Sequence, residues 1–434
     1  MPSRSPSLSV PLPFFLAAPL GLAAGGLLLA RADGDILVAI NAPRTLAVTH
    51  TVVLGWLTTS IMGAIYQLGP AVFGGRLVSE RLAHIQLITH VVALTTFVVA
   101  LYSWNLALMG TAGVGLVLSF ALFLWNAVPA VWGGSSAGLP RVYLRYSMIF
   151  LAGTILLGLT WLMALQHLWF PITAGRLSAH AHIGMVGWLS LTLMGASYQL
   201  IPMFSVIRTG RNRLGRLALA LTIIGLLVFA LLIFTDPREG VRIVAALGLS
   251  AGPCLWAWSI LGMLRRRSRR RLDIQGRATM VSLGFLALTI VLGLGTASGT
   301  PFTSGDQPAR WPLAYAVAGL GGWLGCTLIG NSYKIVPFLV WFHRYAGLVG
   351  RLPVPLMTEM YSEKAATLVL AGHAAATLCV VAGALFGMMD LIRLGALALF
   401  VVATVHTTTL ALTLVARPAS ATIAATPTNP GGTP

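Results

Sequence analysis

Three histidines stand at the start of two long apolar stretches of the sequence. His50 precedes the stretch 51–70, and His180 and His182 precede the stretch 183–202. Neither stretch contains an acidic residue that could pair with them. A neutral imidazole is a good axial ligand for haem iron, and it can equally serve as a buried polar side chain. The three histidines are therefore the candidate cofactor-binding residues, as metal ligands of haem iron.

The spacing of His180 and His182 gives the two imidazoles different surroundings. Residues two apart on a helix project about 200° from each other, so these side chains face opposite sides of one helix. The Val, Leu and Met residues around them suit a porphyrin better than a hydrated cation. The residue types alone leave haem ligation and buried polar packing both open.

The other six histidines fall into two groups. Three are expected near a membrane surface, where a polar side chain is ordinary: His84, His167 and His343. Three lie deeper in apolar stretches, where an imidazole can bond to a carbonyl of the preceding turn or to a hydroxyl: His90, His373 and His406. His90 remains a further metal-ligand candidate, in a rotated copper site with His50.

The composition is that of a polytopic membrane protein. Of the 434 residues 57% are hydrophobic and only 9% are charged, and the mean hydropathy is +0.86. A bilayer core about 30 Å thick needs about 20 apolar residues per helix. The sequence predicts an all-α membrane protein with twelve spans: 12–30, 46–69, 82–103, 110–132, 143–165, 179–202, 215–235, 242–264, 277–298, 312–339, 364–387 and 391–415.

The charge distribution predicts the orientation. With residues 12–30 counted as a helix rather than a signal peptide, most arginines fall in loops on the N-terminal side, and the positive-inside rule puts both termini in the cytoplasm. We therefore expect a multi-pass membrane protein in contact with lipid. The net charge of +18 is mostly topogenic. The run Arg265 to Arg271 has no interleaved aromatic residue, so it indicates no nucleic-acid partner.

Cysteines and the C-terminal segment add little chemistry. Cys254, Cys326 and Cys379 are far apart and form no disulfide framework, CxxC pair or CxxCH haem-attachment motif. Residues 417–434 are small, polar and rich in proline, which predicts a disordered tail.

An internal repeat decides the predicted architecture. Residues 50–70, 182–202 and 317–337 align without a gap, at offsets of 132 and 135 residues. Five positions recur in all three copies: Gly-Trp at 55–56, 187–188 and 322–323, Gly at 63, 195 and 330, Tyr at 66, 198 and 333, and Pro at 70, 202 and 337. Val317 stands where the first two copies have His50 and His182, so scaffold and histidine are separable.

Each copy falls on the second helix of a group of four. An even number of helices per group makes the repeats parallel, with an axis along the membrane normal. We expect pseudo-threefold symmetry, with four-helix repeats at 1–134, 135–270 and 271–416. The stripe of Trp, Gly, Tyr and Pro is expected to be the packing seam between repeats, where glycine allows close backbone approach.

At this point the sequence resembles a known family. Twelve spans in three groups, together with "HTVVLGWLTTSIMGAIYQLGP", "AHAHIGMVGWL", "GASYQLIPMF" and "NSYKIVPFLVWFHRY", are similar to subunit I of the haem-copper oxidase superfamily. More narrowly, these segments are similar to small bacterial members related to oxidase and nitric-oxide-reductase subunits, which implies a bacterial inner-membrane protein. The resemblance covers nearly the whole membrane part. It implies one or two b-type haems and electron transfer, or binding and reduction of nitric oxide or oxygen.

The sequence departs from the family in its ligands. The family's H-x-H pair lies on helix 10 and its copper ligands on helices 6 and 7, whereas this chain has the pair on helix 6, with Tyr315 and Lys334 but no histidine on helix 10. A standard copper centre is therefore doubtful. We expect His50 and His180 to bracket one six-coordinate haem b, and His182 to face the next cleft as candidate proximal ligand of a second haem.

Several alternatives stay open. His50 and His182 facing each other at the central axis is the competing geometry. A transporter, with the histidines and Lys334 along a polar path, and a cofactor-free assembly or structural relative are the rival functions. For the haem protein, the resemblance implies quinol or a cytochrome as electron partner and leaves room for a small accessory subunit.

Overall fold

The structure is a helical bundle that crosses the membrane many times. It is a computed structural model that describes residues 5–134, 138–207, 212–235, 237–267, 271–299 and 306–415. Every regular element within these ranges is a helix. The expected disordered tail, residues 417–434, lies outside the described residues.

Twelve helical stretches appear in the described ranges. Nine are single α-helices: α1 (Pro11–Ala30), α4 (Glu80–Tyr102), α5 (Leu106–Trp132), α6 (Leu139–His167), α9 (Arg213–Ile233), α10 (Glu239–Arg265), α11 (Ile274–Ala297), α14 (Glu363–Phe386) and α15 (Met389–Val415). Three contain a π-helical segment: α2 (Pro43–His50), η2 (Thr51–Thr58) and α3 (Thr59–Phe73); α7 (Ala174–His182), η3 (Ile183–Ser190) and α8 (Leu191–Ser205); α12 (Arg310–Val317), η4 (Ala318–Gly325) and α13 (Cys326–Tyr345). Short 3₁₀ turns lie at Gly34–Leu37, Ala346–Leu348 and Met357–Met360.

Local sequence signals set the helix ends. The side chains of Ser79, Asn105 and Asp273 accept hydrogen bonds from backbone N–H groups three residues later, at 3.4, 3.0 and 2.9 Å, and so begin α4, α5 and α11. Gly74 ends α3 and Gly387 ends α14 with φ of 73° and 68°. Glycine takes this left-handed conformation without strain.

Eleven of the described helical stretches are long and apolar enough to cross a membrane. The chain is therefore a multi-pass membrane protein, because a helix satisfies its own backbone hydrogen bonds inside lipid. The twelfth expected span, from Ala174 to Ser205, is helical throughout but less apolar. It contains His180 and His182, and almost all residues from Gly184 to Tyr198 are buried inside the protein.

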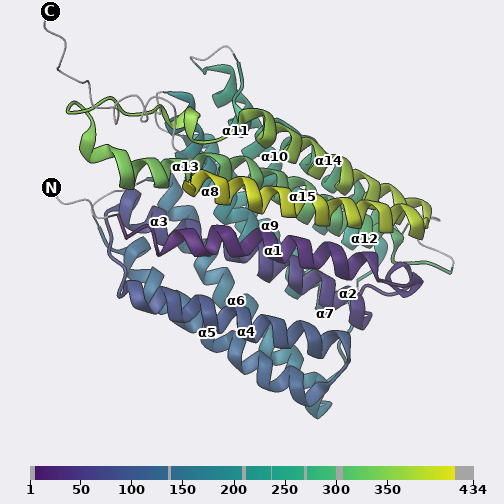
Figure 1. Cartoon of the computed structure of the whole chain (residues 1–434). Helices are drawn as coiled ribbons and strands as arrows, with labels where there is room; N and C mark the ends of the chain where they lie inside the picture. Colours follow the sequence, from purple (N-terminus) through teal and green to yellow (C-terminus); the bar gives the residue numbers. More distant parts are fainter. Residues whose placement is uncertain are drawn as a thin grey trace, which may run out of the picture.

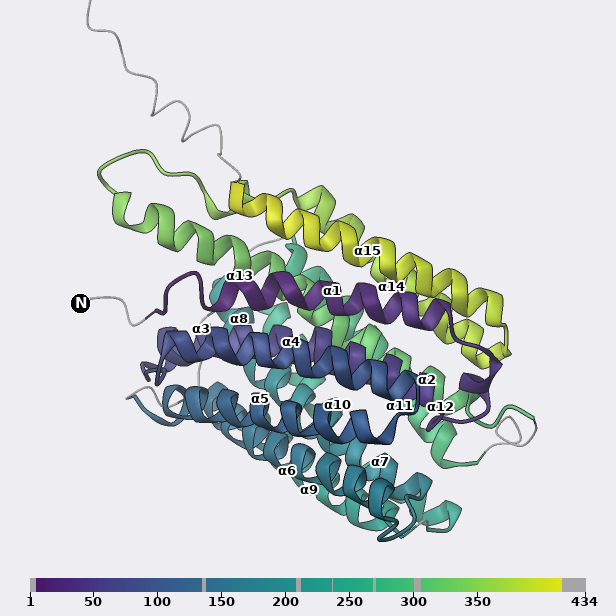
Figure 2. The ribbon, with the colours of Figure 1, turned by 60° about the horizontal axis from the view of Figure 1, so that its bottom comes forward.

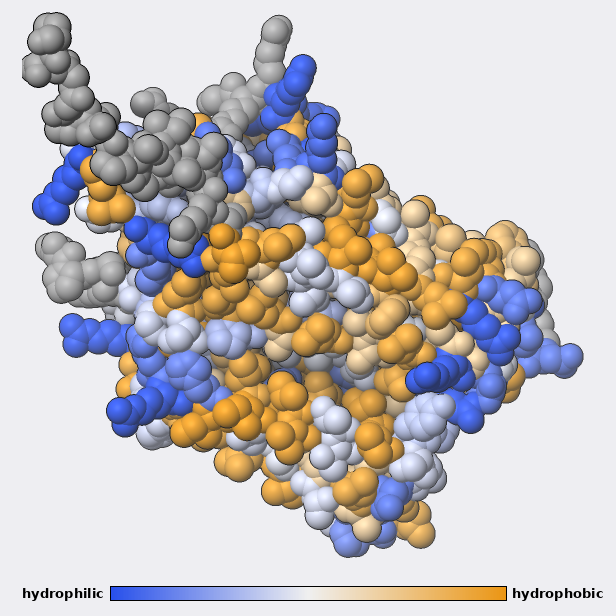
Figure 3. Space-filling view, in the orientation of Figure 1, coloured by the Kyte–Doolittle hydropathy of each residue, from blue (hydrophilic) through white to orange (hydrophobic). Residues whose placement is uncertain are grey.

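The distribution of apolar side chains on the surface agrees with a membrane-spanning bundle. Figure 3 shows apolar side chains over the middle of one face and hydrophilic side chains gathered toward its two ends. The helices run roughly along one direction in Figures 1 and 2, with α1 beside α15 and also in contact with η2. The described chain begins and ends at the same end of the bundle: His343 lies 3.1 Å from the Pro6 carbonyl, and Arg344 donates to the Leu414 carbonyl. We call this the N-terminal end and the other the distal end.

The three π-helical segments begin at Thr51, Ile183 and Ala318. These starts are 132 and 135 residues apart, the same offsets as the sequence repeat. A π-helix bonds i to i+5, which widens the turn and gives its carbonyls room for a second donor. Thr59 Oγ1, for example, donates to the Leu54 carbonyl at 2.8 Å.

The repeated glycines pack inward, against the first helix of their own group. A Cβ at Gly63 would lie 2.6 Å from Cβ of Phe14 on α1, and a Cβ at Gly195 would lie 2.4 Å from Cβ of Tyr143 on α6. Gly330 meets α11 in the same way. The expectation that these glycines form the seam between groups is therefore wrong, because the first helix of each group covers them.

The repeated tryptophans do reach another group of helices. Trp188 Nε1 donates to Thr58 Oγ1 at 3.2 Å, from η3 to η2. The ring of Trp56 lies against Gly325 of η4, where an added Cβ would come within 2.5 Å of it. Thr58 and Gly325 are the last residues of their π segments, so the two contacts use the same register.

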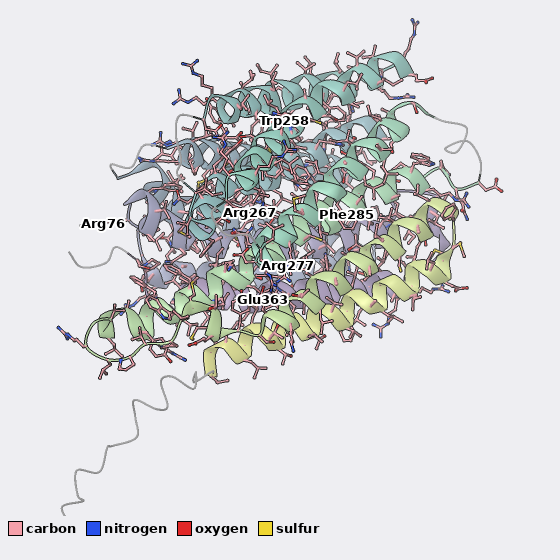
Figure 4. All side chains as sticks on the ribbon, turned by 90° about the horizontal axis from the view of Figure 1, so that it is seen from above. Arg76, Trp258, Arg267, Arg277, Phe285 and Glu363 are labelled. Carbon is pink, nitrogen blue, oxygen red and sulfur yellow. The ribbon has the colours of Figure 1, made fainter. Side chains whose placement is uncertain are left out.

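Ion pairs tie the N-terminal end together. Lys334 Nζ lies 2.7 Å from Asp273 Oδ2, and both side chains are largely buried. Arg277 on α11 and Glu363 at the start of α14 lie beside each other, as Figure 4 shows, and their charged groups are 2.5 Å apart. The Lys334–Asp273 pair fixes the start of α11 to α13, since removing one partner of a buried pair leaves an uncompensated charge.

Candidate functional site

A cavity of about 610 Å³ lies toward the distal end of the bundle. Residues of α2, η2, α4, α5, α6, α7 and η3 line it, and most are Leu, Ile, Val, Phe or Trp. Its size lies within the range of about 300–1,000 Å³ that is common for cofactor and ligand pockets. We call the space between α2/η2 and α6/α7 the first cleft.

His50, the last residue of α2, lines this cavity. Its Nδ1 lies 2.8 Å from the Leu46 carbonyl one turn earlier. Because a carbonyl only accepts, Nδ1 carries the proton and the lone pair is on Nε2. The ring of Phe97 packs against the imidazole, with centroids 5.4 Å apart at 72°. His50 is thus held as a neutral imidazole in the tautomer that metal-binding histidines adopt.

His180 lines the same cavity from α7. Its Nδ1 is buried and makes no hydrogen bond within the described part of the chain. A Cβ at Gly158 of α6 would lie 3.3 Å from Cε1 of His180, so the missing side chain leaves room for the ring. An unpartnered buried polar atom costs about 1–3 kcal/mol. Only a group that bonds to Nδ1 itself would offset this cost.

Two further donors lie near the distal part of the cavity, Trp161 in its lining and Arg176 beside the lining residue Phe170. Trp161 lines it, and Trp161 Nε1 is buried without a hydrogen-bond partner in the described residues. The same holds for Nε of Arg176, one turn before His180. Arg176 lies over the rings of Phe170 and Phe234 at 5.4 and 5.2 Å, and both rings also pack against Trp161. The rim therefore offers hydrogen-bond donors to an acidic group.

His182 lies in a second cleft, between α7/η3 and α12. Its Nδ1 lies 2.8 Å from the Ser178 carbonyl, and its Nε2 lies 2.9 Å from the hydroxyl of Tyr315. The ring of Phe229 packs on it with centroids 4.4 Å apart. Tyr315 donates to Nε2, because Nδ1 carries the proton. Both nitrogens of His182 are therefore already engaged.

The structure thus separates the three candidate ligands. His50 and His180 meet at one cavity, and His182 does not face His50, which argues against the competing axial geometry. His90 is not among the residues that line the cavity. Its Nε2 lies 3.2 Å from the Leu54 carbonyl and its Nδ1 lies 3.3 Å from Ser119 Oγ.

The offsets of the sequence repeat account for which residues face each other in the two clefts. His180 aligns with Val48 and Tyr315 at the offsets of the sequence repeat, as His182 aligns with His50 and Val317. The first cleft joins His50 and His180, and the second joins His182 and Tyr315. The remaining two aligned residues, Val48 and Val317, pack against one apolar cluster. The role of Tyr315 was missed from the sequence, although its alignment with His180 is a signal that could have found it.

The remaining histidines have local roles. His84 Nε2 lies 2.8 Å from the Ser9 carbonyl near the N-terminal end. His406 lies 3.3 Å from Ser332 Oγ and 3.1 Å from the Tyr333 hydroxyl. His373 Nε2 lies 2.8 Å from the Gly321 carbonyl. The deep histidines His90 and His373 thus bond to carbonyls of another helix, not of their own preceding turn. Within the described residues, no three His, Cys, Asp or Glu side chains gather as a metal site.

The fold is similar to that of a solved structure. The chain is similar to a haem-copper terminal oxidase, seen as a dimer by cryo-electron microscopy, with a TM-score of 0.66 and 14% identity over 95% of this chain and 85% of that chain. No family model and no curated protein matches the sequence. At this identity the likeness shows the fold alone. The chain has a haem-copper-oxidase-like membrane fold, which confirms the family resemblance at that level.

Proposed function

We propose that the protein is an integral membrane b-type haem protein that transfers electrons, with His50 and His180 as axial ligands of a haem in the first cleft. One observation carries the proposal. Two imidazoles from different helices line one apolar cavity of about 610 Å³, and no Asp or Glu is among the described residues that line it. A neutral imidazole pair in an apolar pocket is a common way to hold a haem iron.

The residues present fit this group. His180 Nδ1 and Trp161 Nε1 are buried without partners in the described chain, and Gly158 leaves the space that the His180 ring needs. Trp161 and Arg176 would hold the acidic substituents of the macrocycle at the distal rim. When bound, haem supplies a one-electron redox centre whose potential depends on its axial ligands and burial.

The chain's own side chains account for the other requirements. The hydrogen bond from His50 Nδ1 to the Leu46 carbonyl fixes the tautomer and raises the basicity of Nε2. Phe97 restricts rotation of the same ring. The apolar walls exclude water and so favour the less charged state of whatever they enclose.

Electron transfer is better supported than gas reduction. Binding and reduction of nitric oxide or oxygen needs an open coordination position, and His182 was the candidate ligand for it. The hydrogen bond from Tyr315 occupies Nε2 of His182, which favours a single bis-histidine haem. Quinol or a cytochrome would be the electron partner, with or without a small accessory subunit, and no copper is required.

The same proposal includes three parallel four-helix repeats, at 1–134, 135–270 and 271–416. The equal offsets of the π segments and the shared register of the Trp56 and Trp188 contacts support it. The arginine-rich N-terminal end supports termini in the cytoplasm of a bacterial cell, which puts the first cleft toward the periplasmic side.

The rival functions receive less support. For a transporter, Lys334 would have to line a path, yet its ammonium is paired with Asp273. The cavity on the bundle axis, lined by Ala64, Ala196 and Asn331 among others, has only about 40 Å³, room for about one or two waters. A cofactor-free relative does not explain a large apolar cavity with unpartnered ring nitrogens.

Purification with haem and metal analysis tests the proposal. We expect one haem b per chain, a low-spin reduced-minus-oxidised spectrum, and iron without stoichiometric copper. A colourless protein that stays colourless after addition of haem would contradict it, and a second haem would contradict the assignment of the second cleft.

A further inference from the structure

His90 and His373 make the same unusual bond in two groups of helices. Each is the eleventh residue of its helix, α4 or α14, and each is fully buried. His90 Nε2 lies 3.2 Å from the Leu54 carbonyl and His373 Nε2 lies 2.8 Å from the Gly321 carbonyl. Leu54 and Gly321 are each the fourth residue of a π segment. We call these bonds the imidazole clasps.

The chemistry of the clasp fixes its direction. A carbonyl only accepts, so Nε2 of each histidine carries the proton and donates. In His90 the other nitrogen is satisfied by Ser119 Oγ at 3.3 Å. The Leu54 carbonyl accepts the His90 bond in addition to the bond from Thr59 Oγ1 at 2.8 Å, and the widened π-helical turn makes room for both. His90 is therefore a donor to backbone, with no nitrogen left for a metal.

The clasp of His90 borders the first cleft. Leu54 is one turn after His50 and itself lines the cavity. Phe97, two turns after His90 on α4, packs its ring against the His50 imidazole at 5.4 Å. Helix α4 thus holds the His50 segment at two points, the backbone at Leu54 and the ring itself. The register of α4 along η2 decides where Phe97 meets His50.

We propose that His90 is a positioning residue for His50: its clasp on the Leu54 carbonyl sets the orientation of the His50 imidazole in the first cleft. This inference rests on the proposed function, since the orientation matters through the haem that His50 would hold. It assigns His90 a role that differs from the copper ligand expected with His50.

The third group of helices provides a matched control. The His373 clasp has the same donor, the same acceptor position and the same burial. Val317 stands in place of His50, and Val380 is seven residues after His373, as Phe97 is after His90. In the second group Thr222 aligns with His90, and its hydroxyl bonds to Ala218 of its own helix, so no clasp forms there. The clasp therefore occurs both with and without a candidate ligand in the described part of one chain.

The test compares His90→Leu with His373→Leu in the purified full-length protein. Both variants lose one buried donor, so we expect similar drops in the thermal unfolding temperature. Only His90→Leu should change the electron paramagnetic resonance of the oxidised haem and its midpoint potential, and speed haem transfer to apomyoglobin by about 10-fold. His90→Gln, which retains a donor near the Nε2 position, should restore most of the parent spectrum.

The outcomes separate the two claims. If the parent protein binds no haem, the proposed function fails and the positioning role fails with it. If the parent binds haem and His90→Leu leaves spectrum, potential and transfer rate unchanged, or shifts them no more than His373→Leu does, only the positioning role is overturned. Should His90→Leu not fold, Ser119→Ala gives the answer: a change in the electron paramagnetic resonance of the oxidised haem larger than that of His373→Leu supports the role, and no such change overturns it.

Discussion

The first and second clefts use one template with different results. In both, a histidine ends an α-helix just before a π segment, its Nδ1 lies 2.8 Å from the carbonyl four residues earlier, and a phenylalanine packs on its ring: His50 with Phe97, and His182 with Phe229. The difference is the residue that comes from the neighbouring helix. His180 stands in the first cleft and Tyr315 in the second.

On the proposed function, this difference determines which cleft takes a ligand. A tyrosine hydroxyl reaches Nε2 of His182 and closes the second cleft with a hydrogen bond at 2.9 Å. A second imidazole in the first cleft leaves a cavity of about 610 Å³ and an unpartnered Nδ1 on His180. Under the proposed function, the aligned histidine positions are candidate ligand positions, and the facing residue determines whether they are used.

The largest expected effect is at the two facing histidines of the first cleft. His50→Ala and His180→Ala should each abolish the low-spin haem spectrum, because one axial ligand is lost. His182→Ala should keep both the spectrum and the haem content. Absorption of the purified variants, normalised to protein, measures this, and a parent-like spectrum for His50→Ala would show that the ligands lie elsewhere.

A methyl group beside His180 should have the next largest effect. Gly158→Ala places a Cβ 3.3 Å from Cε1 of His180, so the ring must shift, whereas Gly153→Ala on the same helix meets nothing within 4 Å. We expect Gly158→Ala to weaken haem retention by about 10-fold, of the order seen when the support of a metal ligand is disturbed. Equal haem transfer rates for the two variants would argue that His180 is not a ligand.

The donors at the rim should matter less. Trp161→Phe removes the buried N–H together with part of the ring, and a typical hydrogen bond contributes about 0.5–1.5 kcal/mol net. We expect haem to leave several-fold faster, while the spectrum stays low-spin. Haem dimethyl ester, which has no free acid, should show no difference between Trp161→Phe and the parent; a difference there would mean that Trp161 acts through packing.

The smallest effect on the haem should come from the second cleft. Tyr315→Phe leaves Nε2 of His182 buried without a donor, which costs about 1–3 kcal/mol of stability. Thermal or denaturant unfolding in detergent should show this loss, with haem content and spectrum unchanged. A new haem in Tyr315→Phe would instead indicate that the tyrosine keeps the second cleft closed against a ligand it could otherwise bind.

Much of the membrane fold is readable from the sequence, because each span is a long apolar run whose length the bilayer sets. The helical angle between His180 and His182 also predicts that they face different surroundings, which depends only on local geometry. The partner of His182 could not be predicted in the same way, since Tyr315 comes from a helix more than a hundred residues away. The inward packing of Gly63 was missed for the same reason: small residues signal close approach without naming the partner helix.

The histidines deep in the bundle show the same limit. His90 and His373 read as isolated polar residues in apolar helices, and the natural expectation is a bond to their own helix. Their actual acceptors are carbonyls of π segments, and nothing in the sequence marks a turn as π-helical before the helices are assembled. The equal spacing of the two histidines from the starts of α4 and α14 becomes meaningful only once those starts are known.

Electron paramagnetic resonance of the oxidised, purified protein, combined with near-infrared magnetic circular dichroism, tests the central claim most directly. It reports both axial ligands of a haem iron without any substitution. The arrangement of His50 and His180 predicts a single low-spin haem with two imidazole ligands. A high-spin haem, a haem with a ligand other than imidazole, or a protein without haem would contradict the account.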